Sequence, residues 1–227
     1  MKRKLTPRPI PKIPRQRLPH DGEGQVVPWD AVFGEQRHRQ AFAFDVLYEK
    51  VVEGREPRVW RPEDLPDLNP NGWPPQKSQS ELERFYGLVG QNQATIDAPY
   101  PHKLAWKKST AVNQFSCHEK VHDSLERVLK RVLDHYGPEE IGRLGLDLWG
   151  GCLNVRQIRG GTRYSTHSWG IALDYDPAHN RLKWGRDRAT FARPDYDMWW
   201  ALWEEEGWVS LGRARNFDWM HVQAAKI

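Results

Sequence analysis

The stretch that decides the fold is Tyr164-Ser165-Thr166-His167-Ser168-Trp169-Gly170-Ile171-Ala172-Leu173-Asp174. It places an imidazole and a carboxylate a short way apart, in a segment typical of a loop followed by a strand. Ile171 and Leu173 alternate with Ala172 and Asp174, and this period of two puts Ala172 and Asp174 on one face of the strand. Gly170 allows the backbone to turn or to approach a neighbour closely just before the strand.

A second stretch near the C-terminus, Phe217-Asp218-Trp219-Met220-His221-Val222-Gln223, supplies another imidazole and another carboxylate. His167, Asp174 and His221 together make a three-ligand set for a divalent metal ion, with one position left for water. Zinc suits such ligands and lowers the pKa of a bound water toward about 7. Asp218 is then placed to take a proton and pass it to a leaving amine. If residues 219–222 are extended, Asp218 and His221 point to opposite faces, so we expect a bend or bulge there.

Taken together, Ser165-x-His167-x-x-Gly170-x-Ala172-x-Asp174 and Asp218-x-x-His221 resemble the signature of a family of peptidoglycan zinc metallopeptidases. This is the D-alanyl-D-alanine carboxypeptidase and L-alanyl-D-glutamate endopeptidase group, which includes phage endolysins and the vancomycin-resistance dipeptidases. The likeness spans residues 85–223 weakly and is strong in the two motifs. It implies that the two histidines and Asp174 bind Zn²⁺ and that Asp218 is the general base. The dipeptidase branch has Glu at the base position, so Asp218 favours the endopeptidase branch.

The order of predicted elements favours an α+β domain with a small antiparallel sheet. The resemblance implies the same fold, a central sheet with helices packed on one side, as in Hedgehog and DD-peptidase domains. The clearest helix covers residues 116–136, where Val121, Leu125, Val128 and Val132 form an apolar stripe that Gly137-Pro138 ends. Further helices are expected at residues 37–52, 80–86 and 195–206, and strands at 94–101, 144–148, 154–158, 171–174, 208–211 and 219–222.

Proline and charge divide the chain into a basic Pro-rich tail (1–20), an N-terminal extension and linker (21–78) and the metallopeptidase domain (79–227). The tail holds seven Lys or Arg residues and no acid, which leaves 27 basic against 30 acidic residues in the rest of the chain. Such a tail is usually disordered, and it could bind an anionic polymer such as DNA, teichoic acid or a membrane surface. A nucleic-acid partner is the weaker alternative.

No apolar run is long enough to span a membrane, and prolines at positions 7, 9, 11 and 14 interrupt the place where a signal peptide would be apolar. We therefore expect synthesis in the cytoplasm and action on the cell wall after delivery by a holin or a virion. Cys117 and Cys152 are expected to be reduced. The sequence gives no indication of the oligomeric state.

Other residues complete the expected site. A positive group must stabilise the oxyanion of the scissile carbonyl, and Arg156 is the first candidate, with Arg159 second. Ser165 either binds substrate or orients the loop. Trp169 and Trp219, inside the motifs, are expected to wall the substrate cleft.

A rival motif, His118-Glu119-Lys120-Val121-His122, fits H-E-x-x-H on the predicted helix. Its flanks are charged, the helix's apolar stripe lies on the adjacent face and no third ligand follows at the usual spacing, so we interpret it as a chance match. Asp176 and His179 are interpreted as turn formers.

These observations predict a zinc-dependent hydrolase of a peptide bond in peptidoglycan stem or cross-link peptides. The bond is left open between L-Ala–D-Glu, D-Ala–D-Ala and a cross-bridge. The alternative is a non-catalytic binding module that uses zinc only for structure.

Overall fold

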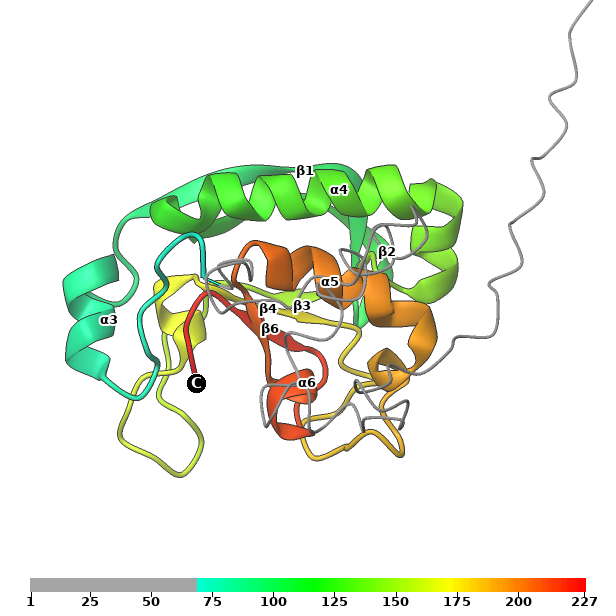
Figure 1. The fold of residues 1–227 in the computed structure, drawn as a ribbon. Helices are drawn as coiled ribbons and strands as arrows, with labels where there is room; N and C mark the ends of the chain where they lie inside the picture. The colour runs from blue at the N-terminus through cyan, green and yellow to red at the C-terminus, as the bar shows by residue number, and fades with distance from the viewer. Residues whose placement is uncertain (1–68) are drawn as a thin grey trace, which may run out of the picture. The chain divides into compact units, whose positions relative to one another are not determined.

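A computed structural model describes residues 69–227 (Figure 1). The basic tail, the helix expected at residues 37–52 and most of the linker lie outside the described residues. In chain order the elements are α3 (Gln79–Tyr86), β1 (Gln93–Leu104), β2 (Lys107–His118), α4 (Glu119–Leu144), β3 (Leu148–Gly151), the 3-10 turn η3 (Thr166–Trp169), β4 (Ala172–Tyr175), the 3-10 turns η4 (Thr190–Ala192) and η5 (Pro194–Tyr196), α5 (Asp197–Glu205), β5 (Val209–Ser210), α6 (Leu211–Arg215) and β6 (His221–Gln223).

The strands form one six-stranded sheet in the order β2-β1-β3-β4-β6-β5. The α+β class is confirmed, but the sheet is mixed rather than antiparallel, because β1 and β3 pair in parallel. β1 is irregular just before the residues that pair with β3. Its register with β2 shifts between Asp97 and His102, where Pro99 and Pro101 offer no backbone N–H. Residues 103 and 104, beyond this irregularity, are the ones that pair with β3.

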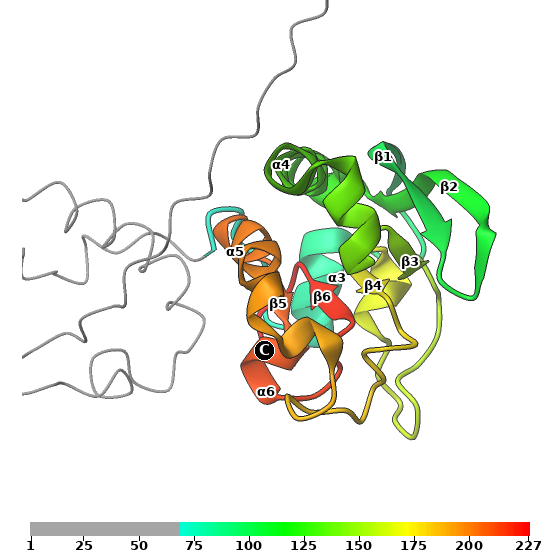
Figure 2. The same cartoon turned by 90° about the vertical axis from the view of Figure 1, so that its right-hand side faces the viewer.

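Helices α4 and α5 contact each other and lie over one face of the sheet (Figures 1 and 2). The stripe of α4 is buried as expected, and α5 adds the aromatic part of the core. From β4, Tyr175 points toward this layer, since its ring lies 5.0 Å from that of Trp199. Leu173 shares that face by alternation, so Ala172 and Asp174 face the opposite side of the sheet.

The predicted helix at residues 116–136 differs from α4 at both ends. Residues 116–118 belong to β2, a strand that the sequence analysis did not assign, and α4 begins at Glu119. Gly137 has φ 69° and ψ 165°, so the first helical segment does end there. A second segment begins at Pro138, which tolerates the first helical position because its missing N–H has no partner to lose.

Two of the predicted strands are displaced or absent. The strand expected at residues 144–148 begins only at Leu148. Residues 154–158 form no strand and belong to a loop that is closed by an isolated bridge between Gln157 and Tyr164.

The end of the linker packs on the domain as an extended wrap. Trp73 is only 3% exposed and donates its indole N–H to the backbone carbonyl of Glu206. Pro75 and Lys226 form a parallel bridge. Through Trp73, this segment therefore contributes to the core of the domain. Nowhere within residues 69–227 is there a helix of the length and apolarity that a membrane crossing requires.

Candidate metal centre

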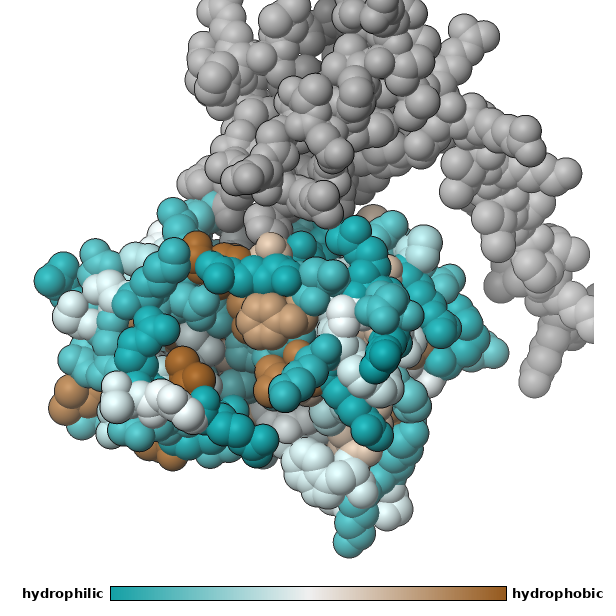
Figure 3. Space-filling view, turned by 90° about the horizontal axis from the view of Figure 1, so that it is seen from below, coloured by the Kyte–Doolittle hydropathy of each residue, from teal (hydrophilic) through white to brown (hydrophobic). Residues whose placement is uncertain are grey.

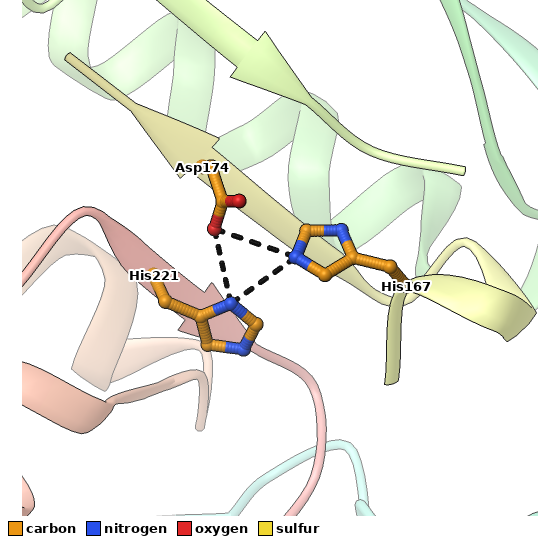
Figure 4. A group of neighbouring side chains, drawn as sticks. All are labelled: His167, Asp174 and His221. Atoms are coloured by element: carbon orange, nitrogen blue, oxygen red, sulfur yellow. Dashed lines mark hydrogen bonds and ion pairs between the residues drawn. The ribbon is translucent and has the colours of Figure 1, made fainter. Parts of the chain in front are cut away.

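Three elements that are distant in sequence bring the predicted ligands together. His167 lies in η3, Asp174 in β4, and His221 begins β6. In the antiparallel pairing of β4 with β6, Asp174 and His221 are directly opposite each other. Cross-strand partners share one face of the sheet. The side chains of all three residues point toward a common centre (Figure 4).

Two glycines make this arrangement possible. Gly170 ends η3 with φ 72°, and a Cβ there would lie 2.3 Å from the side-chain oxygen of Gln93. Gly150 in β3 faces Asp174, and a Cβ there would lie 2.9 Å from the Asp174 backbone oxygen and 3.0 Å from its Cβ. Both positions need a residue without a side chain. Gly170 needs it for its left-handed backbone and for lack of space, and Gly150 needs it because two strands approach each other closely there.

The distances between the ligand atoms fit a metal ion. His167 Nε2 lies 3.2 Å from His221 Nδ1, His221 Nδ1 lies 3.0 Å from Asp174 Oδ1, and His167 Nε2 lies 3.4 Å from Asp174 Oδ1. Tetrahedral zinc with bonds of about 2.0–2.2 Å separates its ligand atoms by about 3.3–3.5 Å. Within residues 69–227, these three form the one group of His, Cys, Asp or Glu side chains whose ligand atoms converge in this way.

Hydrogen bonds on the far side of each ring determine which nitrogen faces the centre. His167 donates its Nδ1–H to the backbone carbonyl of Cys152 at 2.7 Å. His221 donates its Nε2–H to Gln223 Oε1 at 3.1 Å. In the neutral rings the opposite nitrogens therefore carry lone pairs, and both face a carboxylate oxygen of Asp174. Three such atoms repel one another unless a cation or a proton lies between them, and this is the donor set that a divalent metal ion prefers.

Gln223 is a functional residue that the sequence analysis did not single out. Its Oε1 also accepts from the Thr166 hydroxyl at 3.3 Å, and its amide N–H groups donate to Gln76 Oε1 and to the Ala225 carbonyl, both at 3.0 Å. The Gln223 side chain is 1% exposed, and these hydrogen bonds fix it in one orientation. The only sequence signal was its place two residues after His221, on the same strand face.

The electrostatics of the centre favour charge on Asp174. Burial raises the pKa of this carboxyl, but His167 and His221 outweigh burial and hold the pKa well below its usual range. For His221, burial lowers the pKa, while the hydrogen bond and charge of Asp174 raise it more. The carboxylate is thus ionised under all ordinary conditions and available as a ligand.

Asp218 lies beside the three ligands because the chain turns at this residue. Asp218 has φ 56°, and its carbonyl accepts from the N–H of His221 at 3.1 Å. The expected bend therefore exists, as a left-handed residue followed by a turn into β6. Asp218 is 8% exposed, and its Oδ1 is buried with no hydrogen-bond partner among the described residues. Burial raises its pKa to about 6, Asp174 adds to this, and the charges of His221, His167 and Arg156 oppose it.

Of the other expected site residues, Arg156 and Arg159 lie exposed on one loop and Ser165 is buried at the start of η3. Arg156 is exposed, and its backbone accepts from the Ser168 hydroxyl and from the N–H of Ser165, which fixes its loop to η3. Its guanidinium is near enough to lower the pKa of Asp218. Arg159 lies exposed on the same loop. Ser165 is 8% exposed and caps η3 by accepting from the N–H of His167, so it orients the loop.

The expectation that two tryptophans wall a substrate cleft is not met. Trp169 is fully buried and donates its indole N–H to the Gly87 carbonyl at 2.8 Å. Trp219 is 3% exposed and packs against Gly212 and Trp200. Both are core residues, because a substrate contact requires a surface that solvent can reach.

The rival motif is structural. His118 is buried as the N-cap of α4, where its Nδ1 accepts from the N–H of Lys120 and its Nε2–H donates to the Tyr86 carbonyl. His122 is bonded to the exposed Asp123. With one ring used as a cap and the other on the surface, the pair forms no metal site. Asp176, at φ 41°, and His179 bond each other across a turn, as expected. Cys117 and Cys152 are buried free thiols.

The surface near the centre is formed by two loops. Figure 1 shows the loops after β3 and after β4 at the bottom of the domain, and Figure 3, seen from below, shows a hollow bordered by hydrophobic and hydrophilic residues. Exposed apolar side chains on or beside these loops are Leu153, Val155, Ile158, Leu182 and Phe217. These loops thus carry exposed apolar side chains together with the exposed cationic side chains of Arg156 and Arg159.

Comparison with known proteins yields no match: no family model, no curated protein and no solved structure is significantly similar to this chain. The site's own geometry therefore carries the functional argument.

Proposed function

We propose that this protein is a zinc-dependent peptidase that hydrolyses a peptide bond in the stem or cross-link peptides of peptidoglycan. The observation that carries the proposal is the convergence of His167 Nε2, Asp174 Oδ1 and His221 Nδ1 beside the unpaired carboxyl of Asp218. A purely structural zinc site is closed by four protein ligands, whereas a hydrolytic one has three and an acid nearby. The motif resemblance supports the same conclusion.

Zinc, when bound, supplies a Lewis acid that polarises a carbonyl and makes water nucleophilic near neutral pH. The chain's own residues do the rest. Asp218, ionised above its pKa of about 6, accepts a proton from the attacking water and donates it to the leaving amine. Arg156, whose positive charge lowers the pKa of Asp218, stabilises the negative charge that develops on the carbonyl oxygen.

The composition of the loop after β3 supports a short acidic peptide as substrate. Arg156, Arg159 and Arg163 lie on the loop after β3 together with the exposed Val155 and Ile158. Stem peptides of peptidoglycan carry free carboxylates and small alkyl side chains, and these match the cationic and apolar parts of the loop. The place of action under this proposal is the cell wall, reached by holin- or virion-mediated delivery.

The proposal is tested with purified full-length protein and peptidoglycan fragments of known structure. Mass spectrometry of the products identifies the bond that is cleaved. We expect cleavage that stops when the metal is chelated and returns when zinc is added. In Asp218→Asn we expect the turnover rate to fall at least about 100-fold while zinc stays bound, because a positioned acid–base group contributes about 10²–10⁴-fold.

Asp218→Asn is the sharper substitution because Asn also tolerates the left-handed backbone that Asp218 adopts at φ 56°. Asp134→Asn, on the exposed surface of α4, is the matched control and should retain full activity. Undiminished cleavage by zinc-loaded Asp218→Asn would refute the assigned base. A protein that binds zinc but cleaves no wall peptide would be the binding module considered as the alternative.

A further inference from the structure

The turn between β1 and β2 carries a tryptophan that the fold does not need. Leu104 pairs with Lys107, so Ala105 and Trp106 form a two-residue turn. Trp106 is 68% exposed, the most exposed of the large hydrophobic side chains in the described part of the chain. Turns of this kind favour Gly, Asn or Asp for conformational reasons, and an exposed indole adds nothing to the core. Neither turn chemistry nor packing accounts for the residue.

The surroundings of Trp106 are cationic. No Asp or Glu occurs between Asp97 and Glu119, and Lys107 and Lys108 follow the indole directly. Both lysines are exposed, and neither forms an ion pair with any residue of the described range 69–227. By contrast, Lys103 pairs with Asp147 at 2.6 Å. The turn thus presents an aromatic face beside two uncompensated positive charges.

The turn itself supplies none of the three side chains of the metal centre. The ligands come from η3, β4 and β6, whereas β1 and β2 lie at the other end of the strand order. Figure 2 shows β1 and β2 at one edge of the described domain, with their turn extending away from the helices. Trp106 is therefore not one of the residues that make up the centre.

We propose that Trp106, Lys107 and Lys108 form a docking site for an anionic polysaccharide, which is the glycan of the cell wall if the proposed function holds. The indole packs against the apolar face of a sugar ring, and the lysines pair with carboxylates attached to the polymer. Ser109 and Thr110, next along β2, supply hydroxyls for the polar groups of the sugars. The proposal rests on the proposed function for the identity of the glycan.

The composition of the turn favours a glycan over other anionic partners. Insertion into a lipid surface needs a contiguous apolar face, and Trp106 is followed by four polar residues, Lys107 to Thr110. Nucleic acid binding draws on many phosphate contacts, and two lysines supply few. One aromatic ring with a few polar and charged neighbours offers a surface of the size that one or two sugar rings cover.

The test is sedimentation of the full-length protein with purified, insoluble cell wall. All variants are made in the Asp218→Asn background so that the wall stays intact. We expect Trp106→Ala to bind about tenfold more weakly, the size of effect typical of a central aromatic contact, and Trp106→Phe to retain part of the binding. Lys107→Ala/Lys108→Ala should weaken binding and reduce its dependence on salt. Leu88→Ala, which removes another exposed side chain, and Lys130→Ala, on α4, are the matched controls.

A second arm separates this proposal from the proposed function. In the chain with Asp218 intact, Trp106→Ala should cleave a soluble wall peptide at the normal rate. Equal sedimentation of Trp106→Ala and its controls would overturn the docking site. A loss of soluble-peptide cleavage in Trp106→Ala would also overturn it. So would binding that depends on Trp106 with anionic lipid vesicles or DNA but not with cell wall. Trp106-dependent sedimentation by a protein that cleaves no peptide would support the docking site and count against the peptidase.

Discussion

At the scale of single residues, Gln223 determines which nitrogen of His221 faces a metal ion. Its Oε1 accepts the Nε2–H of His221 at 3.1 Å and leaves Nδ1 free for the centre. We predict that Gln223→Leu weakens zinc binding about 10–100-fold, the usual cost of losing such a support. Competition with a chelating dye measures this affinity without reference to catalysis.

Gln91→Leu is the control for this prediction, because the Gln91 side chain is exposed. Gln223→Glu restores an acceptor for His221 and should bind zinc better than Gln223→Leu. In the metal-free protein, nitrogen NMR of the imidazoles should show the Nε2–H tautomer of His221 in the parent and a mixture in Gln223→Leu. Equal zinc affinity in parent and Gln223→Leu would contradict the role.

Asp218 gives a pH-dependent prediction for the metal-free protein. Burial raises its pKa from 3.8 to about 6, so the folded state binds a proton more tightly than the unfolded state does. Stability from this group is therefore present at low pH and is lost as the pH rises through about 6. The shift corresponds to about 3 kcal/mol. We expect Asp218→Asn to be more stable than the parent at pH 7 by up to that amount, and the difference to close as the pH falls toward 4.

Urea unfolding of the two proteins at a series of pH values, with a chelator present, measures the difference. Zinc should reduce the difference, since a cation beside Asp218 favours its ionised form. A difference that grows as the pH falls would mean that Asp218 is stabilised as a carboxylate, contrary to its burial.

The sequence predicted that His167, Asp174 and His221 come together because their residue types and spacing are themselves the signal. It did not identify Gln223 or the Cys152 carbonyl, since an amide two residues from a histidine is common and a backbone group has no sequence signature. Trp169 and Trp219 were misplaced for a related reason. A tryptophan inside a motif can equally pack beneath the motif or face the substrate, and only burial separates these positions.

At the scale of elements, the turn from η3 into β4 depends on Gly170. Its φ of 72° and the contact of 2.3 Å that a Cβ would make with Gln93 both oppose any side chain. We predict that Gly170→Ala lowers the free energy of unfolding by about 1–3 kcal/mol and weakens zinc binding, because η3 holds His167. Denaturant unfolding and zinc titration measure the two effects.

Gly142→Ala provides the contrast. Gly142 lies inside α4, and no atom is within 4 Å of the place that an added Cβ would occupy. Alanine there should raise the free energy of unfolding by about 0.5–1 kcal/mol, because it has the higher helix propensity. If both substitutions had the same sign, glycine at position 170 would not be needed for conformation.

Among the elements, the sequence predicted α3 and α5 best, each to within two residues at either end, and the apolar stripe of α4 correctly but not its ends. It missed β2, whose exposed side chains are mostly small and polar and give no clear alternation. It also could not show the parallel pairing of β1 with β3, because the pairing of strands that are far apart in the chain leaves no pattern within the short strand β3.

At the scale of the whole molecule, a bound metal ion joins three segments that are far apart in the chain. We predict that zinc raises the free energy of unfolding by about 2.7 kcal/mol when its free concentration is about 100 times the dissociation constant. Unfolding of the full-length protein with zinc and with a chelator measures this gain. His221→Ala should show no gain, and a gain of the same size in that variant would place the bound zinc elsewhere.

Asp174 and His221 are directly opposite each other across β4 and β6, so the geometry of the centre depends on the register of these two strands. If β6 slipped by one residue, His221 would turn to the helix-covered side of the sheet and the ion would lose a ligand. Because β6 follows the other described elements in the chain, a metal ion would find all three side chains only after this strand has docked in the correct register. Metal capture would therefore distinguish chains that have finished folding from those that have only collapsed.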